Sequence, residues 1–100
     1  MTNISLQDVE QALSKVMHPE INYSLVDLGM IRDVICKDNT VSITLKLPVL
    51  HVPVKGLLMQ SIKDAVTELD AAVHVEIFEE EMNEEERTAF IKMAKEGWKF

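Results

Sequence analysis

The clearest feature of the sequence is an alternation of apolar and polar residues that gives way to helical spacing. Apolar residues take every second position of 41–47, which predicts a strand with one buried face. From Pro53 onward the apolar residues recur every three or four positions, which predicts a helix over 53–69. Pro53 suits the first helical position, because its missing N–H would have no intrahelical partner there. Val52 is therefore predicted to be the N-cap, beside free N–H groups at the positive end of the helix dipole.

The N-terminal part of the chain carries further signals for secondary structure. A helix is expected over 6–17, with Ser5 as its N-cap and Asp8 placed to complete a capping box. A strand is predicted over 29–37. The turn residues Asp38-Asn39 then join this strand to the next one as a hairpin.

The C-terminal part predicts one more strand and one more helix. Alternating apolar residues indicate a strand over 73–77. A helix is expected over 84–96, with Asn83 and Glu86 as a capping pair and Gly97 as the stop. The element order is then α-β-β-α-β-α. This order predicts an α+β, two-layer fold, in which helices cover a small mixed or antiparallel three-stranded sheet in a single domain of residues 1–100.

Composition narrows the range of functions. The net charge of -7 argues against a nucleic-acid partner, since phosphate backbones select basic surfaces. The acidic blocks Glu79–Glu81 and Glu84–Glu86 are either solvated surface or a contact for a basic partner. One cysteine excludes an intrachain disulfide, and no leader-like or membrane-spanning apolar run occurs. We expect a cytoplasmic protein that does not bind membranes.

Several motifs together resemble a known family. They are His18-Pro19-Glu20, the Asp27-Leu28-Gly29 block followed by Arg32-Asp33-Val34, and Pro53-Val54-Lys55 after the second strand. In this order they resemble the SufT/PaaD-like iron–sulfur cluster assembly domains, which also form the N-terminal part of Mrp-type P-loop ATPases. The resemblance covers about residues 5–78 and leaves 79–100 as a C-terminal helical extension.

The resemblance implies a site, and the chain departs from the family at most of its positions. The family-site positions are His18, Glu20, Pro48, Val49, Val52 and Pro53. The family has Asp at position 18, a Thr pair at 48–49 and Cys at 52. A cysteine near a helix N-terminus would ionise readily and bind metal, whereas Val52 has no such chemistry. An iron–sulfur cluster is the cofactor that the family implies, but we expect this chain to hold no cofactor.

Alternative interpretations stay open at several residues. His18, Glu20 and His51 form an acceptable ligand set for zinc or iron. Gly29 indicates either a positive φ in a structural turn or a close approach to a ligand. Cys36 is either a packed strand residue or a redox site. The apolar loop Pro48-Val49-Leu50 either plugs the space of the family site or forms a contact surface.

The expected function is that of an accessory or adaptor protein in iron–sulfur cluster or metallocofactor assembly. It would recognise cluster-assembly or target proteins through the start of the second helix and the acidic segment before the third. The alternatives are a small metal- or ligand-binding domain that uses the two histidines and Glu20, and a structural subunit of a homo-oligomer. No nucleophile–base order, phosphate loop or nucleotide fingerprint occurs, so enzymatic activity is not expected.

Overall fold

A mixed three-stranded sheet lies at the centre of the computed structural model, which describes residues 5–49 and 51–99. Its strands are β1 (Ile31–Lys37), β2 (Thr40–Leu47) and β3 (His74–Glu81), arranged in the order β1-β2-β3. β2 pairs antiparallel with β1 and parallel with β3. A parallel pair needs a crossover connection, and the helix α2 (Lys55–Leu69) supplies it. The mixed sheet confirms the α+β fold expected from the sequence.

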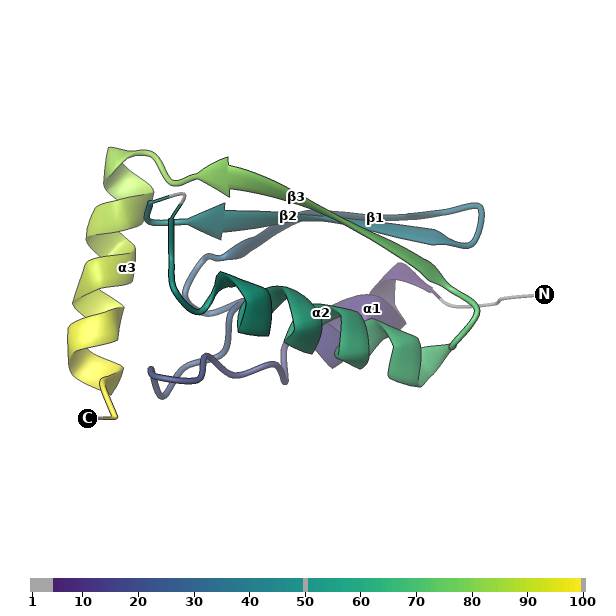
Figure 1. The fold of residues 1–100 in the computed structure, drawn as a ribbon, viewed down its shortest axis with the longest axis horizontal. Coiled ribbons are helices and arrows are strands. Elements are labelled where there is room, and N and C mark those ends of the chain that lie inside the picture. The colour runs from purple at the N-terminus through teal and green to yellow at the C-terminus, as the bar shows by residue number, and fades with distance from the viewer. Residues whose placement is uncertain (1–4, 50, 100) are drawn as a thin grey trace.

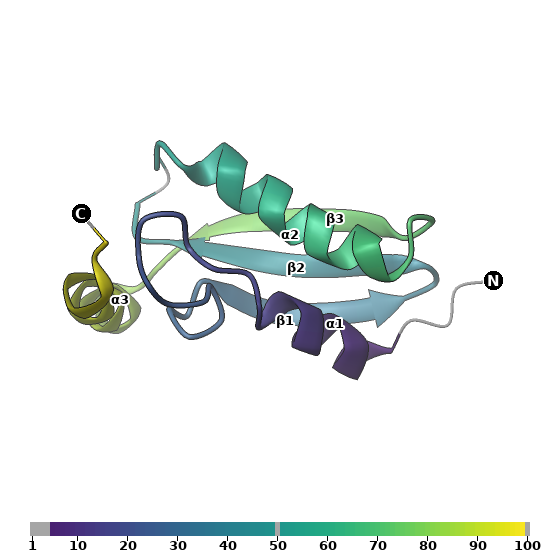
Figure 2. The same cartoon turned by 90° about the horizontal axis from the view of Figure 1, so that it is seen from below.

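The helices lie on one face and at one end of this sheet. The helix α1 (Leu6–Leu13) and α2 cover the same face, and α3 (Glu84–Gly97) runs across the end where β2 and β3 finish (Figure 1). Figure 2 shows α1 and α2 side by side over the sheet, with α3 seen nearly end-on beside it. None of the helices in the described part of the chain is long and apolar enough to cross a membrane.

The core lies between β2 and the two covering helices. The alternate residues of β2 that face the helices have no exposed surface: Val41, Ile43, Leu45 and Leu47. Val9 and Leu13 of α1 and the buried stripe of α2 pack against them. Burying a Leu or Ile side chain contributes about 1.5–3 kcal/mol, so this two-layer packing is the main stabilising contact.

The predicted hairpin turn and both predicted capping boxes are confirmed. Ser5 with Asp8 and Asn83 with Glu86 both form reciprocal capping boxes. Asp38 and Asn39 have φ values of 50° and 65°, the left-handed conformation that a tight hairpin turn requires. Gly29 has a φ of 76°, which supports its structural interpretation.

The prediction that α2 begins at Pro53 with Val52 as N-cap is wrong. The helix begins at Lys55, and Val54 is its N-cap, with no side-chain hydrogen bond to the first turn. The Lys55 N–H donates to the Val52 carbonyl, 3.0 Å away, which closes a separate turn around Pro53. Regular i to i−4 bonding starts only with Leu58 N–H and the Val54 carbonyl. Pro53 therefore shapes the turn that leads into the helix.

Other element bounds also differ from the prediction. α1 ends at Leu13 instead of Met17, because the N–H groups of Lys15 and Val16 bond three residues back. The chain then turns, so that Met17 lies against Ser24. β1 begins at Ile31, two residues late, because the turn that contains Gly29 precedes it. β3 runs from His74 to Glu81 and not over 73–77, so Glu79–Glu81 are strand residues paired with the end of β2.

Candidate functional site

Two loops at one end of the sheet carry the family-site positions. One follows α1 and contains His18 and Glu20, and the other joins β2 to α2 and contains Pro48 to Pro53. Both lie at the end of the molecule where α3 crosses (Figures 1 and 2). The structure thus brings together the two segments that the sequence assigned to one site.

His18 is buried and has a structural hydrogen bond. Its side chain is 4% exposed, and its Nδ1 accepts a hydrogen bond of 3.0 Å from the backbone N–H of Glu20. An aspartate makes the same kind of bond to the residue two positions on. Burial lowers the pKa of His18, and Lys99 lowers it further, although the nearby Glu20 carboxylate opposes this shift. A neutral imidazole with Nδ1 free of hydrogen is the form that this geometry requires.

The C-terminal end of α3 holds the His18 loop in place. The Asn22 N–H donates to the carbonyl of Gly97 at 2.6 Å, and the Lys99 N–H donates to the carbonyl of Glu20 at 3.2 Å. Gly97 packs so closely that a Cβ atom there would lie 2.7 Å from the ring of Tyr23. The backbone of the loop and the backbone of the helix end are therefore in direct contact.

The N-terminal end of α3 holds the other loop through Arg87. Its Nε donates to the Pro48 carbonyl at 2.8 Å, and its Nη2 donates to the Met82 carbonyl at 3.0 Å and to Glu81 at 2.9 Å. One guanidinium thus joins the end of β2, the end of β3 and α3. The sequence pattern does not predict this role for Arg87. Its one signal was a lone arginine just after three glutamates at a helix start.

A buried lysine forms a second connection between the sheet and α3, which the sequence pattern did not predict either. Lys46 on β2 is 8% exposed, and its Nζ lies 3.1 Å from a carboxylate oxygen of Glu80 and 3.1 Å from one of Glu86. Burial by itself lowers the pKa of Lys46, but the hydrogen bonds to Glu86 and Glu80 outweigh it and raise the pKa overall. The backbone N–H of Asn83 and the ammonium of Lys46 lower the pKa of Glu86.

The loop between β2 and α2 has one apolar residue turned inward and two residues turned outward. Val52 is half-buried and packs against the hydrophobic core. Val49 is 50% exposed and His51 is exposed, while Pro48 is half-buried. Leu50 lies outside the described residues. Val52 thus packs inward, and Val49 is available for contact.

The candidate metal ligands do not gather into one group. Across residues 5–49 and 51–99, no three His, Cys, Asp or Glu side chains lie close enough together to hold a metal ion. His18 and Glu20 are neighbours, but His51 does not complete a set with them. The Nδ1 of His18 is already used by the backbone of Glu20.

The only cysteine of the sequence is far from this site. Cys36 pairs with Val41, and Val41 is separated from Leu47, beside the site, by roughly 20 Å of strand. Burial and the nearby Glu10 raise the pKa of the Cys36 thiol, which makes it a poor nucleophile or ligand. Iron–sulfur clusters are held by cysteine thiolates, so the residues present at the site do not fit a bound cluster.

The Asp27-Leu28-Gly29 motif is a turn that supports the site loop. The Asp27 N–H donates to Ser24 Oγ at 3.0 Å, and the Gly29 N–H donates to the Val26 carbonyl at 3.0 Å. Leu28 is buried in the core. These contacts account for the motif by structure alone.

These features define a small α+β domain with two loops clamped at one end of a mixed sheet. Residues 6–77 match the family model described as iron–sulfur cluster assembly protein, and the chain belongs to this family. The resemblance to SufT/PaaD-like domains predicted from the sequence is confirmed.

Similar proteins agree with this assignment. Over 65 residues, 65% of the chain, the sequence is 38% identical to an iron–sulfur cluster carrier protein from Synechocystis sp.. The match spans only 18% of that relative's length. The crystal structure of a domain of unknown function, DUF59, from Bacillus anthracis superposes with a TM-score of 0.69 at 22% identity. That match covers 86% of this chain and 88% of the other, and it supports the fold.

Proposed function

We propose that this protein is a non-enzymatic accessory protein of iron–sulfur cluster assembly in the cytoplasm. It contacts other assembly or target proteins and does not hold a cluster itself. Membership of the family links the chain to cluster assembly. The adaptor mechanism is our inference from the residues at the site.

The observation that supports this proposal most directly is the absence of any thiol from the site. Val52 stands where the family has its cysteine, and its side chain packs inward against the core. Cys36 lies at the other end of β2, with its pKa raised by burial. A cluster needs several thiolates at one place, and a single chain can offer only one.

The proposed contact surface is the exposed part of the loop after β2 together with the start of α3. Val49 and His51 are exposed on the loop, and Glu84 and Glu85 are exposed on the first turn of the helix. Arg87 bonds the Pro48 carbonyl and so holds these two segments beside each other. An exposed valine next to carboxylates suits a partner with a small hydrophobic contact and basic residues around it.

Anaerobic reconstitution with ferrous iron and sulfide tests whether the chain holds a cluster. We expect no lasting visible absorption band after desalting, for the wild type and for Cys36→Ala alike. A stable band in the wild type that Cys36→Ala abolishes would contradict the proposal.

The substitution Val52→Cys provides the matched gain-of-thiol control. We expect the new thiol to label with a maleimide more slowly in the folded variant than in the unfolded variant, because position 52 is half-buried.

Contact with partner proteins is measured by affinity capture with the wild type, with Glu84→Lys/Glu85→Lys, and with Glu10→Lys/Glu76→Lys as a control of equal charge. Capture of the same assembly proteins by all three baits would rule out the start of α3 as the contact.

A further inference from the structure

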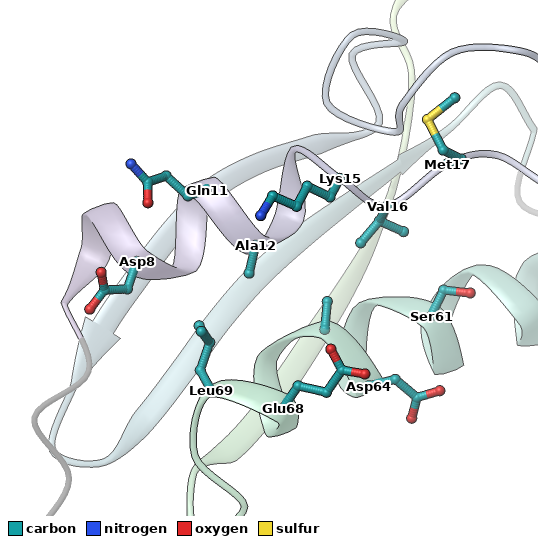
Figure 3. Close-up of a pocket in the computed structure, with 11 residues that line it drawn as sticks. Asp8, Gln11, Ala12, Lys15, Val16, Met17, Ser61, Asp64, Glu68 and Leu69 are labelled. Carbon is teal, nitrogen blue, oxygen red and sulfur yellow. The ribbon is translucent and has the colours of Figure 1, made fainter.

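A groove between α1 and α2 lies outside the site described above. It has a volume of about 630 Å³ and is lined by residues from both helices and from the segment just after α1. Figure 3 shows Ala12 and Val16 pointing toward α2, with Leu69 pointing back toward them. The groove thus has an apolar floor formed by two neighbouring helices.

The shape of the floor suits another helix. The lining side chains Ala12, Ser61 and Ala65 are small, so the backbone of a third helix can approach closely. Met17 and Leu69 lie among the residues that line the groove, and they are 46% and 44% exposed. α1 has 8 residues and is about 12 Å long, so the groove offers about two helical turns of contact.

The charges along the groove favour a basic occupant. Three acidic residues line the groove, Asp8, Asp64 and Glu68, and one basic residue, Lys15. Within the described residues, Glu68 and Lys15 make no hydrogen bond or ion pair with another side chain. Glu68 is also in the last turn of α2, where the helix dipole disfavours a carboxylate. The net charge of -7 adds attraction for a basic partner over longer distances.

We propose that this groove binds an amphipathic helix of a partner protein, with small or apolar residues on its contact face and Lys or Arg along its flanks. The mode is the docking of an amphipathic helix into a groove with an apolar floor and polar walls. Asp64 and Glu68 pair with basic residues on the flank of that helix that lies against α2. This surface is separate from the loops clamped by α3, so the chain can engage two proteins at once.

The test uses two synthetic helical peptides as probes. Both carry Leu and Ala at positions i, i+3, i+4 and i+7, and their flanking positions are Lys in one and Glu in the other. Binding to the full ¹⁵N-labelled chain is followed by fluorescence anisotropy and by amide chemical shifts. We expect the Lys peptide to bind and to shift the amides of Ala12, Val16, Ala65 and Leu69. Failure to bind, or shifts confined to α3 or to the open sheet face, would overturn the proposal.

Matched variants separate the groove from general charge attraction. Asp64→Lys/Glu68→Lys is expected to weaken binding of the Lys peptide at least tenfold, roughly the effect of 1.4 kcal/mol. Glu10→Lys/Glu76→Lys makes the same charge change at residues that do not line the groove, and it is expected to alter affinity by less than about twofold. Equal weakening by both pairs, or equal binding of the Glu peptide, would overturn it. Glu68→Lys suits the helix dipole, so its thermal unfolding midpoint is not expected to fall.

Discussion

At the scale of single residues, His18 shows how a changed side chain can keep a structural role. The family has an aspartate at this position, and the imidazole Nδ1 accepts the Glu20 N–H that an aspartate oxygen would accept. Val52 shows the opposite case, because a valine keeps the packing but cannot act as a thiolate. The backbone of the site is therefore preserved while its ligand chemistry is absent.

Substitution of His18 tests this structural role. His18→Asn keeps a neutral acceptor at this position and is expected to change the free energy of unfolding by less than about 1 kcal/mol. His18→Leu leaves the Glu20 N–H without its partner and is expected to cost about 1–3 kcal/mol. Urea unfolding at neutral pH measures both. Equal destabilisation by the two variants would show that the hydrogen bond is not what His18 contributes.

At the scale of elements, α3 is attached in an unusual way. None of the side chains of α3 is fully buried. Phe90, Met93 and Ala94 are partly buried against the core. The helix is also held by Arg87 at its start, by the Lys46–Glu86 ion pair, and by backbone hydrogen bonds at its end. Because such bonds need close backbone contact, Gly97 at the end of α3 is expected to contribute more to stability than its exposure suggests.

Two glycines give a matched test of that contact. Gly97→Ala would place a Cβ 2.7 Å from the Tyr23 ring, and we expect a loss of about 1–3 kcal/mol in stability. Gly56→Ala in α2 meets nothing within 4 Å, and it is expected to stabilise by about 0.5–1 kcal/mol. Thermal and urea unfolding report both. A Gly97→Ala variant as stable as the wild type would mean that α3 moves away from Tyr23 at little cost.

At the scale of the whole molecule, the proposed contact surface and the thiol of Cys36 lie far apart. The longest dimension is 43 Å, with the clamped loops and α3 at one end and the β1–β2 hairpin near the other. Cys36 is close to that hairpin, where it pairs with Val41. A partner bound at the α3 end would therefore not meet the thiol.

The whole-molecule stability is expected to depend on pH through Glu86. Its pKa is lowered from 4.5 in the folded state, so the unfolded chain takes up the proton first as the pH falls. The contribution of Glu86 to the free energy of unfolding is thus fully present above pH 4.5. It is lost as the pH falls through the folded-state pKa of Glu86.

Glu86→Gln isolates this effect, because glutamine can still complete the capping box with Asn83 but carries no charge. We expect the stability gap between wild type and variant to be constant above pH 4.5 and to close below it. Urea unfolding across this range gives the gap. A gap that does not change with pH would show that the charge of Glu86 does not stabilise the fold.

Local signals in the sequence were enough for the order of the elements, the two capping boxes and the family. Alternation over 41–47, the two capping boxes and the Asp38-Asn39 turn all rest on interactions within a few residues, so the pattern alone predicted them correctly. For Gly29 the sequence left two interpretations open, and the structure shows a positive φ. The start of α2 was predicted wrongly, because the sequence does not show whether Pro53 opens the helix or the turn before it.

The sequence by itself determined the order of elements, the buried face of β2 and the lack of a thiol at position 52. Only the tertiary structure decided that α3 clamps both site loops, that Lys46 is buried between two carboxylates, and that a groove lies open between α1 and α2. The physical reason is how far apart the interacting residues lie in the sequence. Periodicity and capping depend on neighbours in the chain, whereas the bonds of Arg87 and Gly97 join residues 39 and 75 positions apart, which no local pattern encodes.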